Sequence, residues 1–261
     1  MKIISVSNPK GGAGKTVTAV NIAYALARKE KKVLLIDSDP RSAIKAYLGI
    51  EEEDFTLYEL IKNQYENQKI DNLNDYITEK DGIDIIVSSM KISKVSHFFE
   101  IEYDDKQGVF EAITDLTYLF KNYDYVVFDT EGTINDLNTA ILNATDYIFL
   151  PTKSSNIDLN GVPDIINAFT KVKKRNKNLE IKKVFLVDVN DRTNSFKEAK
   201  KEFENYFKDS GIDFSDNYIR HDQNIVNAMK QYKSIFNYKN SSNAAIDYRN
   251  LVDEFLESEG K

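Results

Sequence analysis

Cysteine is absent from the 261-residue sequence, which excludes disulfides, thiolate-bound zinc and iron–sulfur clusters. The two histidines, His97 and His221, are too few for a histidine-rich metal site. No apolar run approaches the roughly 20 residues of a membrane-spanning helix, and no segment rich in proline, glycine or serine divides the chain. The net charge of −7 argues against bulk attraction to nucleic acid, although a local basic patch can still bind it.

What remains is the composition of an ordinary globular protein, with 41% hydrophobic and 30% charged residues. The length allows one large α/β domain or two small ones. Because no linker is present, we predict one domain over residues 1–261. The first strand begins at once, so we expect neither a signal peptide nor an added N-terminal DNA-binding domain, and a cytoplasmic location.

A strand, a glycine-rich loop and a helix follow one another in residues 3–29. In such a loop, backbone N–H groups and the helix N-terminus point at phosphate oxygens. We predict that Lys15 reaches the β- and γ-phosphates and that the Thr16 hydroxyl ligates Mg²⁺. The strict phosphate-loop spacing fails at its first position, where Pro9 replaces glycine. The predicted nucleotide-binding residues of the loop are Gly11, Gly12, Ala13, Gly14, Lys15, Thr16 and Val17.

Acids follow two continuous apolar runs of the kind expected from strands buried on both faces. Asp37 and Asp39 come at the end of the run 33–37, and Asp129 ends the run 123–129. Ligands of an open parallel sheet bind beyond the carboxyl ends of its strands, so these acids should lie beside the phosphate loop. They can hold Mg²⁺-bound water or orient an attacking water. We therefore predict an α/β fold with a mostly parallel, doubly wound sheet flanked by helices, and Mg²⁺ held by Thr16, Asp37 and Asp129.

The helix expected over 164–175 ends in a dense group of basic residues, which continues to the next strand with only Glu180 opposing it. Such a patch in an acidic protein fits contact with the phosphates of a polyanion, or equally a solvated helix end. The residues concerned are Lys171, Lys173, Lys174, Arg175, Lys177, Lys182 and Lys183.

The segment Lys10 to Thr16, K-G-G-x-G-K-T, resembles the deviant Walker A motif of the ParA/MinD family. By this resemblance, Lys10 reaches the nucleotide of a partner subunit. The family's D-x-D-P-Q is similar to the segment 37–41, which implies that Asp39 positions the hydrolytic water and Asp37 supports the metal shell. Arg41 stands in place of the glutamine, and Glu131-Gly132 replaces two prolines after Thr130.

The resemblance extends to the C-terminal half of the chain. It implies that Asn190 recognises adenine and that Arg192 and Arg220 contact DNA, with Arg220 matching the arginine of the family's Ile-Pro-Arg segment. The implied function is that of a ParA-type partition ATPase, with ATP and Mg²⁺ as cofactors. Its ATP-bound homodimer would bind DNA without sequence preference and associate with the nucleoid, and a ParB-type centromere-binding partner would stimulate hydrolysis.

Three other functions of the same fold fit the sequence less well. A MinD-like membrane-positioning ATPase needs basic residues beside a terminal apolar helix face, but the tail holds Asp253, Glu254, Glu257 and Glu259. A nitrogenase-reductase-like electron carrier needs cysteines. A bacterial tyrosine kinase often has a C-terminal tyrosine cluster, whereas the tyrosines here are dispersed. A nucleotide-gated binding protein that does not hydrolyse ATP stays open because of Arg41 and Glu131-Gly132.

Overall fold

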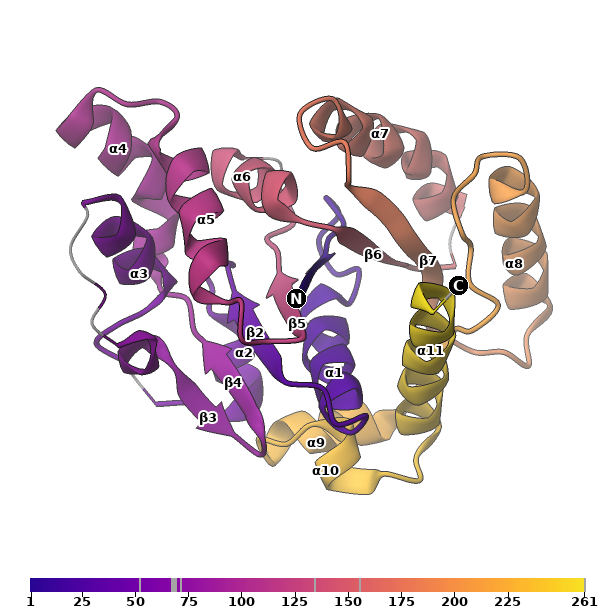
Figure 1. Ribbon diagram of the computed structural model, residues 1–261. Coiled ribbons are helices and arrows are strands. Elements are labelled where there is room, and N and C mark those ends of the chain that lie inside the picture. Colours follow the sequence, from indigo (N-terminus) through magenta and orange to yellow (C-terminus); the bar gives the residue numbers. More distant parts are fainter. Residues whose placement is uncertain (52, 67–69, 71, 134, 155, 261) are drawn as a thin grey trace.

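The computed structural model describes residues 1–51, 53–66, 70, 72–133, 135–154 and 156–260. A twisted sheet runs through the molecule with helices on both of its faces (Figure 1). The strands are β1 (Lys2–Val6), β2 (Val33–Asp37), β3 (Thr78–Lys80), β4 (Ile83–Ile86), β5 (Tyr125–Asp129), β6 (Tyr147–Thr152), β7 (Glu180–Val189) and β8 (Ile219–Arg220).

Within the described ranges the sheet has eight strands, in the order β3-β4-β2-β5-β1-β6-β7-β8. Each neighbouring pair is parallel except β3 and β4. This confirms the predicted mostly parallel, doubly wound sheet. The chain leaves β1 toward β2 on one side, whereas β6 and β7 extend the sheet on the other. The carboxyl end of β1 therefore lies at the switch point where such sheets bind ligands.

The helices cover the sheet as two layers because alternate strand residues face opposite sides. Ile4 and Leu35 pack in the core under α1, α2, α9, α10 and α11, whereas Ile3 and Leu34 pack in the core under α3 to α6. Helices α7 and α8 complete the second layer over β6 and β7. The helices are α1 (Lys15–Ala27), α2 (Ala43–Leu48), α3 (Leu57–Tyr65), α4 (Val95–Tyr103), α5 (Gly108–Leu119), α6 (Asp136–Ala144), α7 (Asn156–Lys173), α8 (Asn194–Phe207), α9 (Gln223–Lys230), α10 (Ile235–Lys239) and α11 (Asn243–Glu259), with 3-10 turns η1 (Leu73–Tyr76) and η2 (Met90–Lys94).

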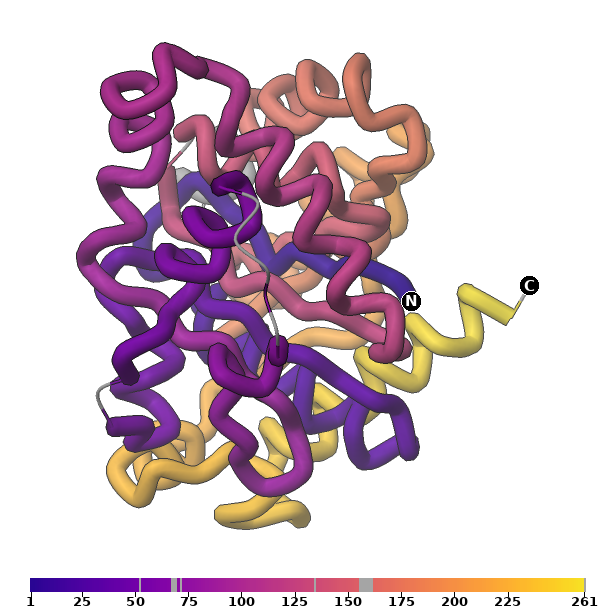
Figure 2. The backbone as a smooth tube through the Cα atoms, turned by 60° about the vertical axis from the view of Figure 1, so that its left-hand side comes forward, coloured from indigo at the N-terminus to yellow at the C-terminus, as the bar shows by residue number. Residues whose placement is uncertain are grey.

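Side-chain contacts fix the start of α3 and the end of α11. Helix α3 begins with a capping box, in which the Glu59 carboxylate accepts from the backbone N–H and the hydroxyl of Thr56. Helix α11 projects from the body at its C-terminal end (Figure 2). Its acids bind back to the chain, with Asp253 paired to Lys29 and Glu259 accepting from the Tyr125 hydroxyl.

No helix within the described ranges combines the length and apolar character needed to cross a membrane.

Candidate functional site

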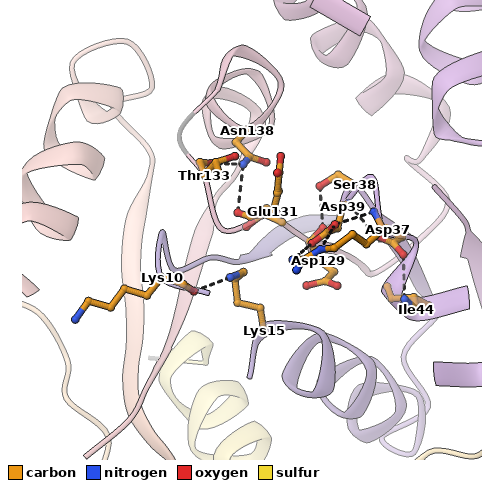
Figure 3. A network of polar contacts seen from close by, with 12 residues as sticks. Lys10, Lys15, Asp37, Ser38, Asp39, Ile44, Asp129, Glu131, Thr133 and Asn138 are labelled. Carbon is orange, nitrogen blue, oxygen red and sulfur yellow. Dashed lines mark hydrogen bonds and ion pairs between the residues drawn. The ribbon is translucent and has the colours of Figure 1, made fainter. Parts of the chain in front are cut away.

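The glycine-rich loop lies between β1 and α1, as predicted (Figure 3). Gly12 and Gly14 have φ angles of 73° and 78°, a left-handed conformation that glycine adopts without strain. Gly14 directly precedes α1, whose first N–H groups lack partners within the helix. This end of the helix is therefore suited to bind an anion.

Asn8 fixes the loop to the sheet, a role that the sequence reasoning missed. Its Nδ2 donates to the Pro151 carbonyl at 2.8 Å, and its Oδ1 accepts from the Lys10 N–H at 2.9 Å. The side chain is 1% exposed. The start of the loop is thus tied to the carboxyl end of β6.

The two lysines of the loop point in different directions. The ammonium of Lys15 is buried in the site and donates to the Lys10 carbonyl at 3.0 Å. Burial lowers the pKa of Lys15, and the charges of Asp129 and Asp39 oppose that change. The side chain of Lys10 points away from Lys15 (Figure 3). A Cβ on Gly132 would lie 3.1 Å from Nζ of Lys15, so the loop after β5 passes directly beside this ammonium.

Asp37 and Asp129 end adjacent strands and are paired in register. Both side chains are buried. Asp37 Oδ1 accepts from the Asp39 N–H at 2.9 Å, and Oδ2 accepts from the Ile44 N–H at 3.0 Å. Burial, followed by the charge of Asp129, raises the pKa of Asp37 well above its ordinary value. Asp37 therefore holds the turn after β2 through both of its carboxylate oxygens.

Asp129 differs from Asp37 because both of its carboxylate oxygens are buried without a hydrogen-bond partner in the described part of the chain. Burial raises the pKa of Asp129 to about 7, and the Thr16 hydroxyl and Lys15 ammonium oppose the rise. An unpartnered buried carboxylate requires a compensating charge.

The group around Asp129 suits Mg²⁺, which takes oxygen ligands and is commonly held by one or two carboxylates, water and substrate phosphates. Thr16 and Asp129 supply a hydroxyl and a carboxylate of this kind. No cluster of three or more His, Cys, Asp and Glu side chains able to hold a metal occurs among the described residues. The donor set thus fits a metal that is completed by a nucleotide.

Asp39, the predicted water-positioning acid, faces the same site from the turn after β2 (Figure 3). Its carboxylate is buried and forms a two-pronged ion pair with Arg41. Burial would raise the pKa of Asp39, but the hydrogen bonds from Arg41 outweigh it and lower the pKa below its ordinary value. The loop opposite is braced by Asn138, whose Nδ2 donates to the carbonyls of Glu131 and Thr133.

A cavity of about 160 Å³ adjoins the far side of the phosphate loop, with Gly12 and Gly14 in its wall. Asp188 and His221 contribute its polar lining, and His221 Nδ1 lies 2.7 Å from Asp188 Oδ1. Asp188 has φ 58° at the end of β7, which turns its side chain from the regular strand direction. Asn190, the predicted adenine-binding residue, is exposed and does not line this cavity. Asp188 lies near the carboxyl end of β7, and this position in the sequence could have indicated that it lines a cavity at that edge of the sheet.

The predicted DNA-binding residues fall into separate groups. Lys171 and Lys173 end α7, and Lys174 and Arg175 follow; all four are exposed near the amino end of β7. Arg192 is exposed beyond the carboxyl end of β7. The structure does not bring these two groups together.

Three other basic residues of that prediction are held by acids. Lys183 is 1% exposed, and its ammonium is bound by Asp213 and Glu254. The structure therefore argues against Lys183 as a DNA contact. Lys182 is largely covered and lies 3.5 Å from Glu180. Arg220 pairs with Asp247 at 2.6 Å and lines the cavity beside the phosphate loop.

Known proteins are similar to this chain in sequence and architecture. The AAA domain family matches residues 1–182. The sporulation initiation inhibitor protein Soj of Bacillus subtilis is 29% identical over 211 residues, which cover 80% of this chain and 81% of Soj. The chromosome partitioning protein ParA of Caulobacter vibrioides is 30% identical over 220 residues, covering 82% and 79% of the two chains.

A solved structure is similar to this chain over nearly its whole length. The crystal structure of a plasmid partition protein from Borrelia burgdorferi matches with a TM-score of 0.69 and 27% identity, covering 98% of each chain. The similarity therefore includes the C-terminal part of the chain, which lies beyond the segment matched by the AAA domain family.

Proposed function

The chain belongs to the ParA-type ATPases of the ParA/MinD superfamily, and from this membership we propose that it is a DNA partition ATPase. ATP binding joins two copies face to face, and the dimer binds DNA without sequence preference. A ParB-type centromere-binding partner stimulates hydrolysis and releases the DNA. Residues 1–261 act as one ATPase domain, cytoplasmic and bound to the nucleoid in the ATP state.

The observation that carries the proposal is the meeting of Lys15, Asp39 and Asp129 at one edge of the sheet. The carboxylates of Asp129 and Asp39 are the two largest influences that raise the pKa of the buried Lys15. Asp129 also lacks any hydrogen-bond partner in the described chain. A site with a buried cation, an unpartnered carboxylate and open helix N–H groups is suited to a phosphate chain with its metal.

Each residue has a part in this mechanism. The loop amides and Lys15 bind the phosphates, and Thr16 and Asp129 would hold Mg²⁺. When bound, Mg²⁺ supplies positive charge that stabilises the charge developing on the transferred phosphoryl group. Asp39 accepts a hydrogen bond from the attacking water and so orients it.

Lys10 would act in the dimer. Its side chain extends away from its own phosphate loop (Figure 3), as a residue that reaches the nucleotide of a second subunit must. ATP then stabilises the dimer, and by linkage it stabilises any surface that only the dimer presents. DNA binding therefore becomes dependent on ATP.

Binding to random-sequence duplex DNA tests the proposal. The measurement is fluorescence anisotropy with ATP, with ADP and without nucleotide, at two salt concentrations. We expect binding only with ATP, weakening as salt rises because phosphate contacts release counterions. Lys15→Ala and Lys10→Ala should abolish it, whereas Lys106→Ala, which removes the same charge from an exposed site, should not. Equal binding in all nucleotide states, or none in any, would refute the DNA role.

A second candidate is a nucleotide-gated binding protein without hydrolysis, which is favoured by the ion pair that occupies Asp39. Single-turnover ATP hydrolysis in the presence of DNA and partner distinguishes the two. A binding-only protein would release no phosphate under these conditions.

A further inference from the structure

Arg41 occupies the carboxylate of Asp39 almost completely. Its Nε donates to Oδ1 at 3.0 Å and its Nη2 donates to Oδ2 at 2.7 Å. The backbone N–H of Arg41 also donates to Oδ1, at 2.9 Å. Both oxygens of Asp39 therefore accept charge-assisted hydrogen bonds, in the two-pronged geometry that makes arginine–carboxylate pairs strong.

The two partners differ in their freedom to move. The side chain of Asp39 is 4% exposed, whereas that of Arg41 is 75% exposed. Asp39 is also held by its backbone, whose N–H donates to the buried Asp37. The guanidinium can consequently leave without opening the core, while the carboxylate stays in position.

This contact bears directly on the reaction assigned to the site. An attacking water must donate a hydrogen bond to Asp39, and the guanidinium lies on the oxygens that would accept it. Glutamine, which the resemblance leads one to expect at this position, is neutral and has no fork of two parallel N–H donors. The two-pronged contact between Arg41 and Asp39, called the clamp below, thus requires arginine at position 41.

We propose that Arg41 is a positioning residue that masks Asp39 and keeps basal ATP hydrolysis slow until its guanidinium is displaced. The inference rests on the proposed role of Asp39 in hydrolysis. It predicts that weakening the clamp speeds the chemical step. Because the charge of Arg41 also acts on Lys15 and Asp129, the Kd for ATP is measured separately from the rate.

Steady-state and single-turnover ATP hydrolysis by the full chain with Mg²⁺ tests this. The variants are Arg41→Gln, Arg41→Lys, Asp39→Asn and the double variant Arg41→Gln/Asp39→Asn. We expect Arg41→Gln to raise kcat and the single-turnover rate constant by about tenfold. Arg41→Lys keeps the charge but not the fork, so its kcat should lie between those of Arg41→Gln and the wild type. Lys106→Gln, which removes a positive charge from an exposed site outside the nucleotide and DNA contacts, should behave as wild type.

The outcomes separate the clamp from the function on which it rests. If Arg41→Gln and Arg41→Lys hydrolyse ATP no faster than wild type while Asp39→Asn is inactive, the clamp is refuted and the role of Asp39 stands. A slower Arg41→Gln also refutes it, because Arg41 would then assist the reaction. If Asp39→Asn retains hydrolysis, the assigned role of Asp39 and the clamp fail together. A double variant as inactive as Asp39→Asn supports action through Asp39.

Discussion

Replacing Asp129 by asparagine should stabilise the nucleotide-free chain and at the same time remove its response to Mg²⁺ and ATP. Asp129 is 1% exposed, and neither of its oxygens has a hydrogen-bond partner in the described chain. The folded protein therefore carries the cost of a buried charge, which Thr16 and Lys15 offset only in part and a bound cation would offset further. Asparagine keeps the shape of the side chain and removes the charge.

The size of the effect follows from the pKa. Burial raises the pKa of Asp129 from 3.8 to about 7. At 1.36 kcal/mol for each unit, ionisation costs the folded state about 4 kcal/mol above pH 7. The buried amide of asparagine costs about 1–3 kcal/mol if it finds no partner. The free energy of unfolding of Asp129→Asn should then exceed that of the wild type by about 1–3 kcal/mol.

The sign of the pH dependence follows from the same shift. Because the pKa is higher in the folded state, the unfolded chain loses its proton first as pH rises. The cost is absent below about pH 4, grows between about pH 4 and 7, and is constant above that range. The advantage of the variant should therefore be about 2–3 kcal/mol smaller at pH 5 than at pH 7.5.

Urea unfolding with EDTA and without nucleotide measures this difference. Asp115→Asn is the control, since Asp115 is exposed on α5 and a surface change of this kind stays within about 0.5 kcal/mol. Adding Mg²⁺ with a non-hydrolysable ATP analogue should stabilise the wild type by mass action, and Asp129→Asn much less. If Asp129→Asn unfolds at lower urea than the wild type at pH 7.5, the buried charge is not a cost and the reasoning is wrong.

Three further results are expected. Gly49→Ala should lower the free energy of unfolding by about 1–3 kcal/mol more than Gly211→Ala. Both glycines have positive φ, but of the two only Gly49 would place its Cβ against a neighbour, 2.4 Å from the Tyr232 ring. Equal losses in urea unfolding would contradict this. Lys183→Met should cost about 1–3 kcal/mol, since it leaves the partly buried Glu254 without its cation while the half-exposed Asp213 can be solvated, yet DNA anisotropy of the folded variant should be unchanged. Chelation of Mg²⁺ should stop ATP hydrolysis, and added Mg²⁺ should restore it; phosphate release that persists in EDTA would exclude the proposed role of Thr16.

Features that depend on short segments were predictable from the sequence. The run Val33–Asp37 forms β2 with the predicted bounds, because a strand covered on both faces requires continuous apolar residues. The phosphate loop and the capping box of α3 are likewise local, since their glycines and polar side chains act within a few residues. Helix α8 was also readable in principle, because Phe196, Ala199, Phe203 and Phe207 recur at helical spacing and are buried.

Contacts between distant segments could not be read in this way. Lys183 looks like part of a basic patch until Asp213 and Glu254, 30 and 71 residues further along the chain, bind its ammonium. Asn8 becomes an anchor of the phosphate loop only because β6 brings the Pro151 carbonyl to it. The contact of Arg41 with Asp39 is local, since the two residues are two positions apart in the chain, but it depends on the turn geometry after β2, which the sequence pattern does not define.

The two groups of exposed basic residues cannot be equally coupled to the nucleotide. Lys171 to Arg175 lie near the amino end of β7, and Arg192 lies beyond its carboxyl end. A strand of ten residues spans about 33 Å, so roughly the width of the sheet separates them. The phosphate loop lies at the carboxyl edge, and a dimer formed across that edge would change the surroundings of Arg192 but not those of Lys171. ATP-dependent DNA binding is therefore more consistent with Arg192, whereas a contact made by the other patch alone would bind DNA in every nucleotide state.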